Sequence, residues 1–104
     1  MRLVYLIYEY NRYSERKEFE DKIAELIEED EDTRFFSPLH AFGWLYDYWD
    51  FNVNPELCRD IMRRCDGALV ISAPGGTVED EIEAADEEGL IVDYEAGVWW
   101  SYYL

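Results

Sequence analysis

The sequence predicts an α/β fold with a small, mostly parallel sheet of about four strands. Four short apolar segments have the composition of buried strands, and they alternate with segments that show helical periodicity. Regular alternation of strand and helix is typical of parallel sheets joined by right-handed crossovers. Because the 104 residues contain no linker-like stretch and no internal repeat, we expect one domain over residues 1–104.

The first half of the chain contains two predicted strands with an amphipathic helix between them. Residues 3–8 form a continuous run of branched and aromatic side chains, which is typical of a strand buried on both faces. Ser14 is a suitable N-cap for the helix. The apolar face of this helix recurs at i, i+4, i+7 and i+8 in Phe19, Ile23, Leu26 and Ile27. Residues 33–36 form the second strand, which ends at Pro38 because proline cannot continue the pairing, so we expect His40 at the carboxyl end of a strand.

An aromatic segment and a second helix follow. Residues 41–53 combine six aromatic side chains with a glycine and two aspartates, which predicts an irregular, partly helical lid. Its rings either stack on the base of a ligand or belong to the core and a subunit interface. Asn54 followed by Pro55 is a strong signal for the start of a helix, and the apolar spacing extends this helix to Cys65.

The third strand runs into a glycine loop. Residues 66–72 predict this strand, residues 77–88 the next helix and residues 90–93 the last strand, with Gly89 as the stop signal of the helix. Open α/β sheets bind their ligands at the carboxyl ends of the strands. We therefore expect a functional site where the third strand meets its helix. The candidate residues at this edge are Ser72, Gly75, Gly76 and, as the first candidate for chemistry, Glu81.

The charge balance is strongly acidic, with 9 Lys and Arg residues against 25 Asp and Glu residues and a net charge of −16. Such a surface repels phosphate backbones and anionic lipids, so we expect neither a nucleic-acid polymer nor a membrane as a partner. A small nucleoside or nucleotide in a local pocket is compatible with this charge. The composition is similar to that of proteins from extremely halophilic archaea or their viruses, and an ordinary acidic mesophilic protein is the alternative. Because the sequence shows no signal-peptide pattern, we expect a cytoplasmic protein, in the host cytoplasm if it is viral.

Cysteine and histidine usage predicts neither a disulfide nor a metal centre. Cys58 and Cys65 lie seven residues apart on the expected helix, about 10 Å along its axis at 1.5 Å per residue, which is beyond the reach of a disulfide. His40 is the single histidine, so no zinc-binding spacing occurs, and we expect no metal and no cofactor. The apolar residues 98–104 either pack back on the domain or form a subunit contact, and we expect a homo-oligomer through this tail.

Four segments in order along the chain resemble the nucleoside 2-deoxyribosyltransferase-like superfamily, in particular its small DUF4406 branch, which is common in phages and prophages. They are residues 1–6, 37–43, 62–70 and 81–92. The resemblance implies a flavodoxin-like (Rossmann-like) three-layer sandwich. It also implies cleavage or exchange of the bond between a base and a deoxyribose, by a nucleoside deoxyribosyltransferase or an N-glycosidase.

Glu81 matches the position of the family's nucleophilic glutamate. A carboxylate can trap an oxocarbenium-like sugar as a covalent glycosyl ester and release it to a second base or to water. Without the resemblance, Glu81 is one more exposed carboxylate of an acidic helix. The substrate would be a nucleoside or nucleotide that contacts Tyr10, His40, Ser72, Gly75 and Gly76. His40 either binds this ligand or caps the helix after Pro38, and Asp66 is expected to be structural.

The first loop departs from the family. Relatives have an alanine-glycine-proline-tyrosine turn where this chain has Ile7-Tyr8-Glu9-Tyr10. Tyr8 in place of glycine removes access to positive φ and introduces a bulky ring where the sugar is expected. The alternative function is therefore a non-catalytic protein of the same fold, which binds a nucleoside or nucleotide or acts as a viral interaction protein.

Overall fold

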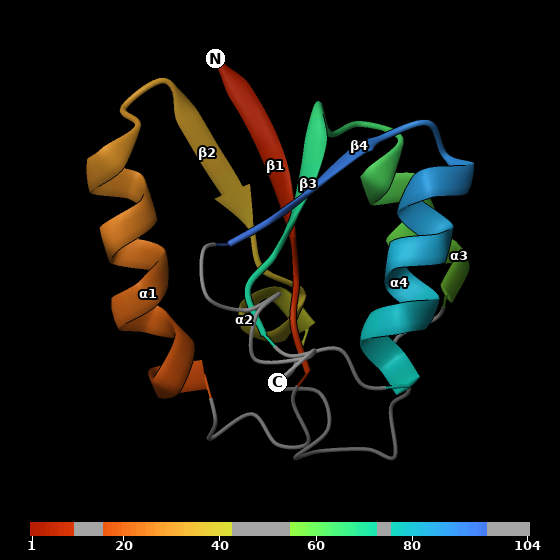
Figure 1. The fold of residues 1–104 in the computed structure, drawn as a ribbon, viewed down its shortest axis with the longest axis horizontal. Helices are drawn as coiled ribbons and strands as arrows, with labels where there is room; N and C mark the ends of the chain where they lie inside the picture. Colours follow the sequence, from red (N-terminus) through yellow and green to blue (C-terminus); the bar gives the residue numbers. More distant parts are fainter. Residues whose placement is uncertain (10–15, 43–54, 73–75, 96–104) are drawn as a thin grey trace.

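The structure is a computed structural model that describes residues 1–9, 16–42, 55–72 and 76–95. Within these residues, strands and helices alternate along the chain, and the strands form one sheet (Figure 1). The elements are β1 (Arg2–Ile7), α1 (Arg16–Glu29), β2 (Thr33–Phe36), α2 (Pro38–Phe42), α3 (Pro55–Met62), β3 (Gly67–Val70), α4 (Gly76–Glu87) and β4 (Ile91–Tyr94).

The sheet has four strands in the order β2-β1-β3-β4, and every neighbouring pair is parallel. Arg2 lies opposite Thr33 of β2, and Ile7 lies opposite Val70 of β3. This architecture confirms the predicted α/β, flavodoxin-like class. Because all strands run in one direction, their carboxyl ends meet at a single edge of the sheet.

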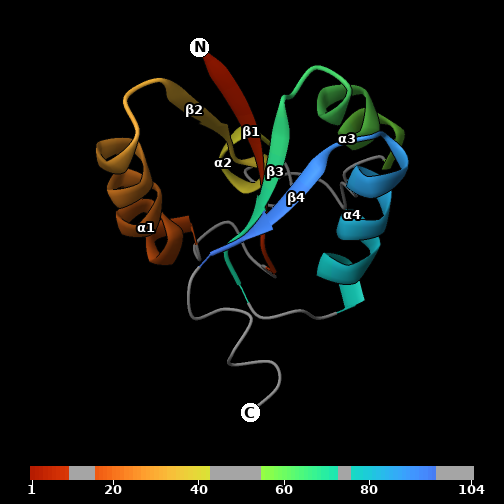
Figure 2. The ribbon, with the colours of Figure 1, turned by 45° about the horizontal axis from the view of Figure 1, so that its top comes forward.

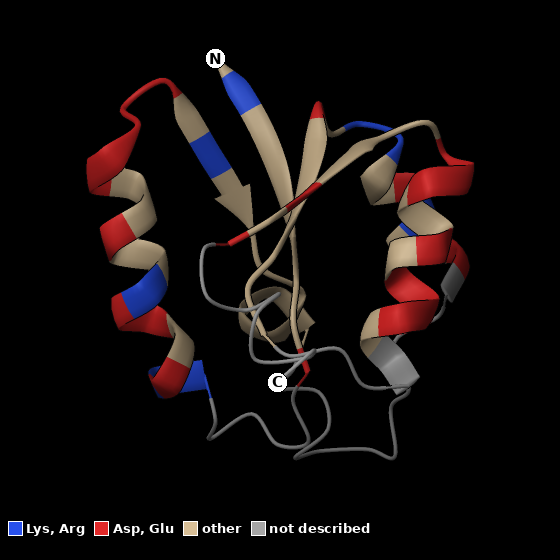
Figure 3. Cartoon of the chain, in the orientation of Figure 1, with Lys and Arg blue, Asp and Glu red and all other residues tan. Residues whose placement is uncertain are grey.

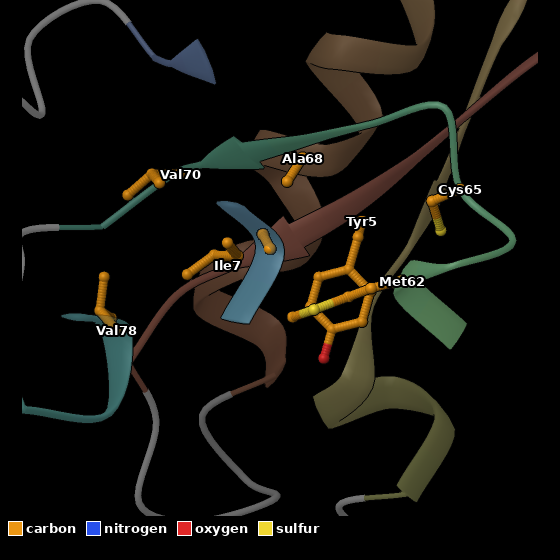
Figure 4. Close-up of a cluster of buried hydrophobic side chains, with 8 residues drawn as sticks. Tyr5, Ile7, Met62, Cys65, Ala68, Val70 and Val78 are labelled. Atoms are coloured by element: carbon orange, nitrogen blue, oxygen red, sulfur yellow. The ribbon is translucent and has the colours of Figure 1, made fainter. Parts of the chain in front are cut away.

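Helices cover both faces of the sheet and give three layers. Figure 2 shows α1 on one side of the strands and α3 with α4 on the other. Leu6 and Tyr8 pack in the cluster that includes α1 side chains, whereas Tyr5 and Ile7 pack in the cluster that includes α3 and α4 side chains. Figure 4 shows this second cluster, with Tyr5 beside Met62. The alternation follows from the two-residue period of a strand.

Strand β1 is the centre of both clusters. Val4, Tyr5, Leu6 and Ile7 each expose 4% of their surface or less. The prediction of a strand buried on both faces is therefore confirmed. Strand β4, at one edge of the sheet, is much less buried than β1: Ile91 of β4 is 70% exposed.

The helix predicted to extend to Cys65 is shorter in the structure. Helix α3 ends at Met62, and Cys65 lies beyond it, so the prediction that Cys58 and Cys65 share one helix is wrong. The N–H of Arg64 donates to Ile61 O, and that of Cys65 donates to Met62 O; such bonds span three residues and tighten the chain into a turn. Both cysteines are free.

Two further sequence signals lie near the C-terminal ends of α1 and α4. Ile27, expected on the apolar face of α1, is 40% exposed. Gly89 ends α4 with φ of 82°, a backbone conformation that glycine adopts without strain. This residue confirms the predicted stop.

Acidic residues outnumber basic ones in α1 and α4, and their positions are marked in red in Figure 3. Ion pairs connect the ends of α3 and α4: Arg59 Nη2 of α3 lies 2.8 Å from Glu87 Oε2 of α4, and Arg63 Nε, directly after α3, lies 2.7 Å from Glu88 Oε2, directly after α4. Lys22 of α1 pairs with Glu95, which directly follows β4. None of the helices in the described ranges is long and apolar enough to cross a membrane.

Candidate functional site

Side chains that follow β1 and β2 meet at the carboxyl edge of the sheet. Tyr8 directly follows β1, and Ser37 directly follows β2. The Tyr8 hydroxyl and Ser37 Oγ share a hydrogen bond, and Ser37 Oγ lies 2.6 Å from Nδ1 of His40 in α2. His40 Nε2 lies 3.4 Å from Glu20 Oε1 of α1. A continuous row of polar groups therefore runs from the end of β1 to the surface of α1.

The ring of Tyr8 is turned toward α1. It is 3% exposed, and its centroid lies 4.3 Å from that of Phe19. Burial raises the pKa of Tyr8 to about 12, so the hydroxyl group stays protonated near neutral pH. The ring that was expected to fill the sugar site thus packs on the α1 layer, and its hydroxyl reaches Ser37.

Glu81 of α4 lies on the other side of this edge. The exposed carboxylates of α4 include Glu79, Asp80 and Glu83, whereas Glu81 is partly buried. Desolvation raises the pKa of Glu81 to about 7. The structure therefore distinguishes Glu81, the first candidate from the sequence, from the exposed carboxylates beside it.

The charge of Glu81 affects the pKa of two groups outside α4, one after β1 and one in α3. Its charge raises the pKa of Tyr8, at the end of β1, and that of the Cys58 thiol in α3, in each case as a smaller effect than burial. The Cys58 thiol is also close to the Tyr5 hydroxyl, which lowers its pKa by a hydrogen bond. Glu81 is thus a carboxyl group in a largely apolar setting with protonated hydroxyl and thiol groups nearby.

Ser72 connects two strand ends. Its Oγ accepts a hydrogen bond of 2.8 Å from the backbone N–H of Glu9. This contact fixes the chain after β1 against the chain after β3, which supports the shape of the edge. The Ser72 hydroxyl oxygen is therefore engaged with the backbone, while its position beside the candidate site is the one expected.

Some predicted site residues lie outside the described residues. They are Tyr10 and Gly75, and the same holds for the aromatic lid beyond Phe42, for Ser14 and for the apolar tail. Gly76 is the first residue of α4. Asp66 is at the opposite edge, where its carboxylate accepts a 2.8 Å hydrogen bond from the Leu3 N–H, as expected of a structural residue.

A groove of about 530 Å³ lies between α1, the end of β2 and α2. Its lining residues are Glu20, Ile23, Ala24, Ile27, Phe35, Phe36, Ser37, His40 and Ala41. His40 therefore lines this groove. Its Nδ1 is also hydrogen-bonded to Ser37, the residue that precedes α2, as expected of a capping role. Glu20 was not predicted as a site residue. Its spacing from Ile23, Ala24 and Ile27, at i+3, i+4 and i+7, is the signal that could have identified it.

Within the described ranges, no group of three or more His, Cys, Asp or Glu side chains is arranged to hold a metal ion. What the edge does offer is a partly buried carboxyl group, a protonated phenol and a serine–histidine pair. Comparison of the chain with known protein families, curated proteins and solved structures finds no match.

Proposed function

We propose that this protein acts on the bond between the base and the sugar of a small deoxynucleoside, as a deoxyribosyltransferase or an N-glycosidase. Glu81 is the proposed nucleophile. The observation that supports this role is the position of Glu81: it is partly buried beside the carboxyl ends of parallel strands, where α/β folds bind ligands.

In the proposed reaction the Glu81 carboxylate attacks C1′ of the sugar as the bond between C1′ and the base nitrogen breaks. The base leaves with the electron pair of that bond and takes up a proton, and a glycosyl ester forms on Glu81. Water or a second base then attacks C1′, loses a proton and releases the carboxylate. The Ser37–His40 pair supplies hydrogen-bonding groups for the sugar, and the buried Tyr8 hydroxyl, protonated near neutral pH, holds Ser37 in position.

The pH dependence follows from the role of Glu81. The nucleophile must be ionised, and burial raises the pKa of Glu81 to about 7. We therefore expect kcat/KM for base release to rise with pH through about pH 7. If Glu81 instead donated a proton to the base, activity would fall over the same interval.

The test is incubation of the purified protein with a panel of deoxynucleosides and their monophosphates at low and high salt, with free base followed by chromatography. Glu81→Gln removes the nucleophile with little change in shape and is expected to abolish base release. Glu83→Gln removes an exposed carboxylate of the same helix and is expected to leave release unchanged. Release that survives Glu81→Gln would refute the assignment.

The second candidate function is binding of a nucleoside without catalysis. It is favoured by Tyr8, because the chain has a buried tyrosine where the family has a glycine that lets the backbone approach the ligand. Absence of base release from the folded wild-type protein, together with saturable nucleoside binding that Glu81→Gln leaves intact, would support this function over the first.

A further inference from the structure

We propose that the groove between α1, β2 and α2 binds a small organic cation with an apolar body, such as an aromatic amidine or amine. The proposal is independent of any chemistry at Glu81. The groove volume of about 530 Å³ is within the range of small-molecule sites, which are mainly apolar with a few polar groups. Its apolar walls come from three elements: Ile23, Ala24 and Ile27 of α1, Phe35 and Phe36 of β2, and Ala41 of α2.

The groove follows the outer edge of the sheet. β2 is the terminal strand of the described sheet and pairs there with β1 alone. Phe35 packs with the α1-side cluster, and Phe36 stacks on Tyr5 of the opposite cluster with ring centroids 5.7 Å apart. Both residues line the groove, so a flat apolar ligand would contact β2 on one side and the aliphatic residues of α1 on the other.

Glu20 supplies the group that selects a cation. Its carboxylate lines the groove and has two basic neighbours, Arg16 Nε at 3.9 Å and His40 Nε2 at 3.4 Å. Neither separation is a well-formed hydrogen bond, and His40 Nε2 is buried without a hydrogen-bond partner among the described residues. The Glu20 carboxylate therefore has acceptor capacity for the N–H groups of a ligand.

The surrounding charge disfavours an anion. Helix α1 has six acidic residues against three basic ones, and the whole chain has a net charge of −16. Figure 3 marks the acidic residues along α1 in red. An approaching cation is attracted by this field and an anion is repelled, although salt screens the distant charges and leaves Glu20 as the local determinant.

Benzamidine is the probe that tests this proposal, because benzamide and benzoate match its shape with a neutral and a negative group. Binding is measured by calorimetry, and the site is located from the methyl NMR signals of Ile23 and Ile27, with Ile82 of α4 as the reference. We expect saturable binding of benzamidine in the millimolar range or tighter, with benzamide and benzoate at least tenfold weaker.

Three variants distinguish binding in the groove from a general attraction of the cation to the negatively charged surface. Glu20→Gln is expected to weaken benzamidine binding about tenfold, and Ala24→Phe is expected to abolish it by filling the groove. Glu18→Gln makes the same charge change at an exposed position of α1 outside the groove, and is expected to change affinity less than twofold. Equal weakening by Glu18→Gln and Glu20→Gln, equal binding of the three probes, or no saturable binding at millimolar concentrations would each overturn the proposal.

Discussion

Glu81 should make the folded protein less stable as the pH rises, and Glu81→Gln should remove this effect. Burial raises the pKa of the folded-state carboxyl to about 7, from its ordinary value of 4.5. The folded protein therefore binds the proton more tightly than the unfolded chain does. Below pH 4.5, Glu81 is protonated in both the folded and the unfolded state, and the full stability is present. Between pH 4.5 and 7 the unfolded chain releases this proton while the folded protein keeps it, so the free energy of unfolding falls.

The size of the effect follows from the two pKa values. Linkage gives a loss of about 1 kcal/mol at pH 5 and about 3 kcal/mol at pH 8.5. The glutamine variant has no charge to bury at either pH. Its advantage in free energy of unfolding over the wild type should therefore grow by about 2 kcal/mol or slightly more between pH 5 and pH 8.5.

Urea denaturation at a series of pH values measures this difference directly. Glu83→Gln is the matched control, because it makes the same chemical change at an exposed position of α4 and reports the general cost of net negative charge. The reasoning is refuted if the stability difference between Glu81→Gln and the wild type is the same at every pH, or if Glu83→Gln reproduces it.

Three further experiments test other parts of the structure. Gly89→Ala places a Cβ at φ of 82° and should cost about 1 kcal/mol, seen as a drop of several degrees in Tm; an unchanged Tm would contradict the assigned conformation. Asp66→Ala removes the acceptor of the Leu3 N–H and should lower the free energy of unfolding by about 1 kcal/mol in urea, without effect on ligand binding. Tyr8→Phe and Ser37→Ala should show a coupling of about 1 kcal/mol in a double-mutant cycle, whereas additive effects would exclude their hydrogen bond.

The fold could be predicted from the sequence because its strands differ in composition from its helices. β1 is a run of branched and aromatic residues buried on both faces, and no amphipathic helix has such a run. The end of α3 could not be predicted in the same way. Cys65 continues the apolar spacing of Ile61 and Met62, and it packs in the same core from the turn, so periodicity does not show where the helix stops.

The candidate site was only partly visible in the sequence. Glu81 is one of several carboxylates in α4, and its burial depends on how α3 and α4 pack together. A signal was nevertheless present: Glu81 lies three residues after buried Val78 and four before buried Ala85, which places it beside the apolar face of the helix. Ser37 and Tyr8 are 29 residues apart, and only the parallel sheet brings them together.

Helix α1 packs on the sheet with only partly buried side chains, which affects how the protein unfolds in part. No residue of α1 is fully buried, so this helix should detach in partial unfolding events that leave β1 and β3 intact, and its amides should exchange with deuterium well before those of the central strands. Phe19 of α1 covers the ring of Tyr8. Each detachment of α1 would admit water to Tyr8 and expose the carboxyl edge of the sheet. The free energy of docking α1 on the sheet therefore also sets the fraction of molecules in which the candidate site is assembled.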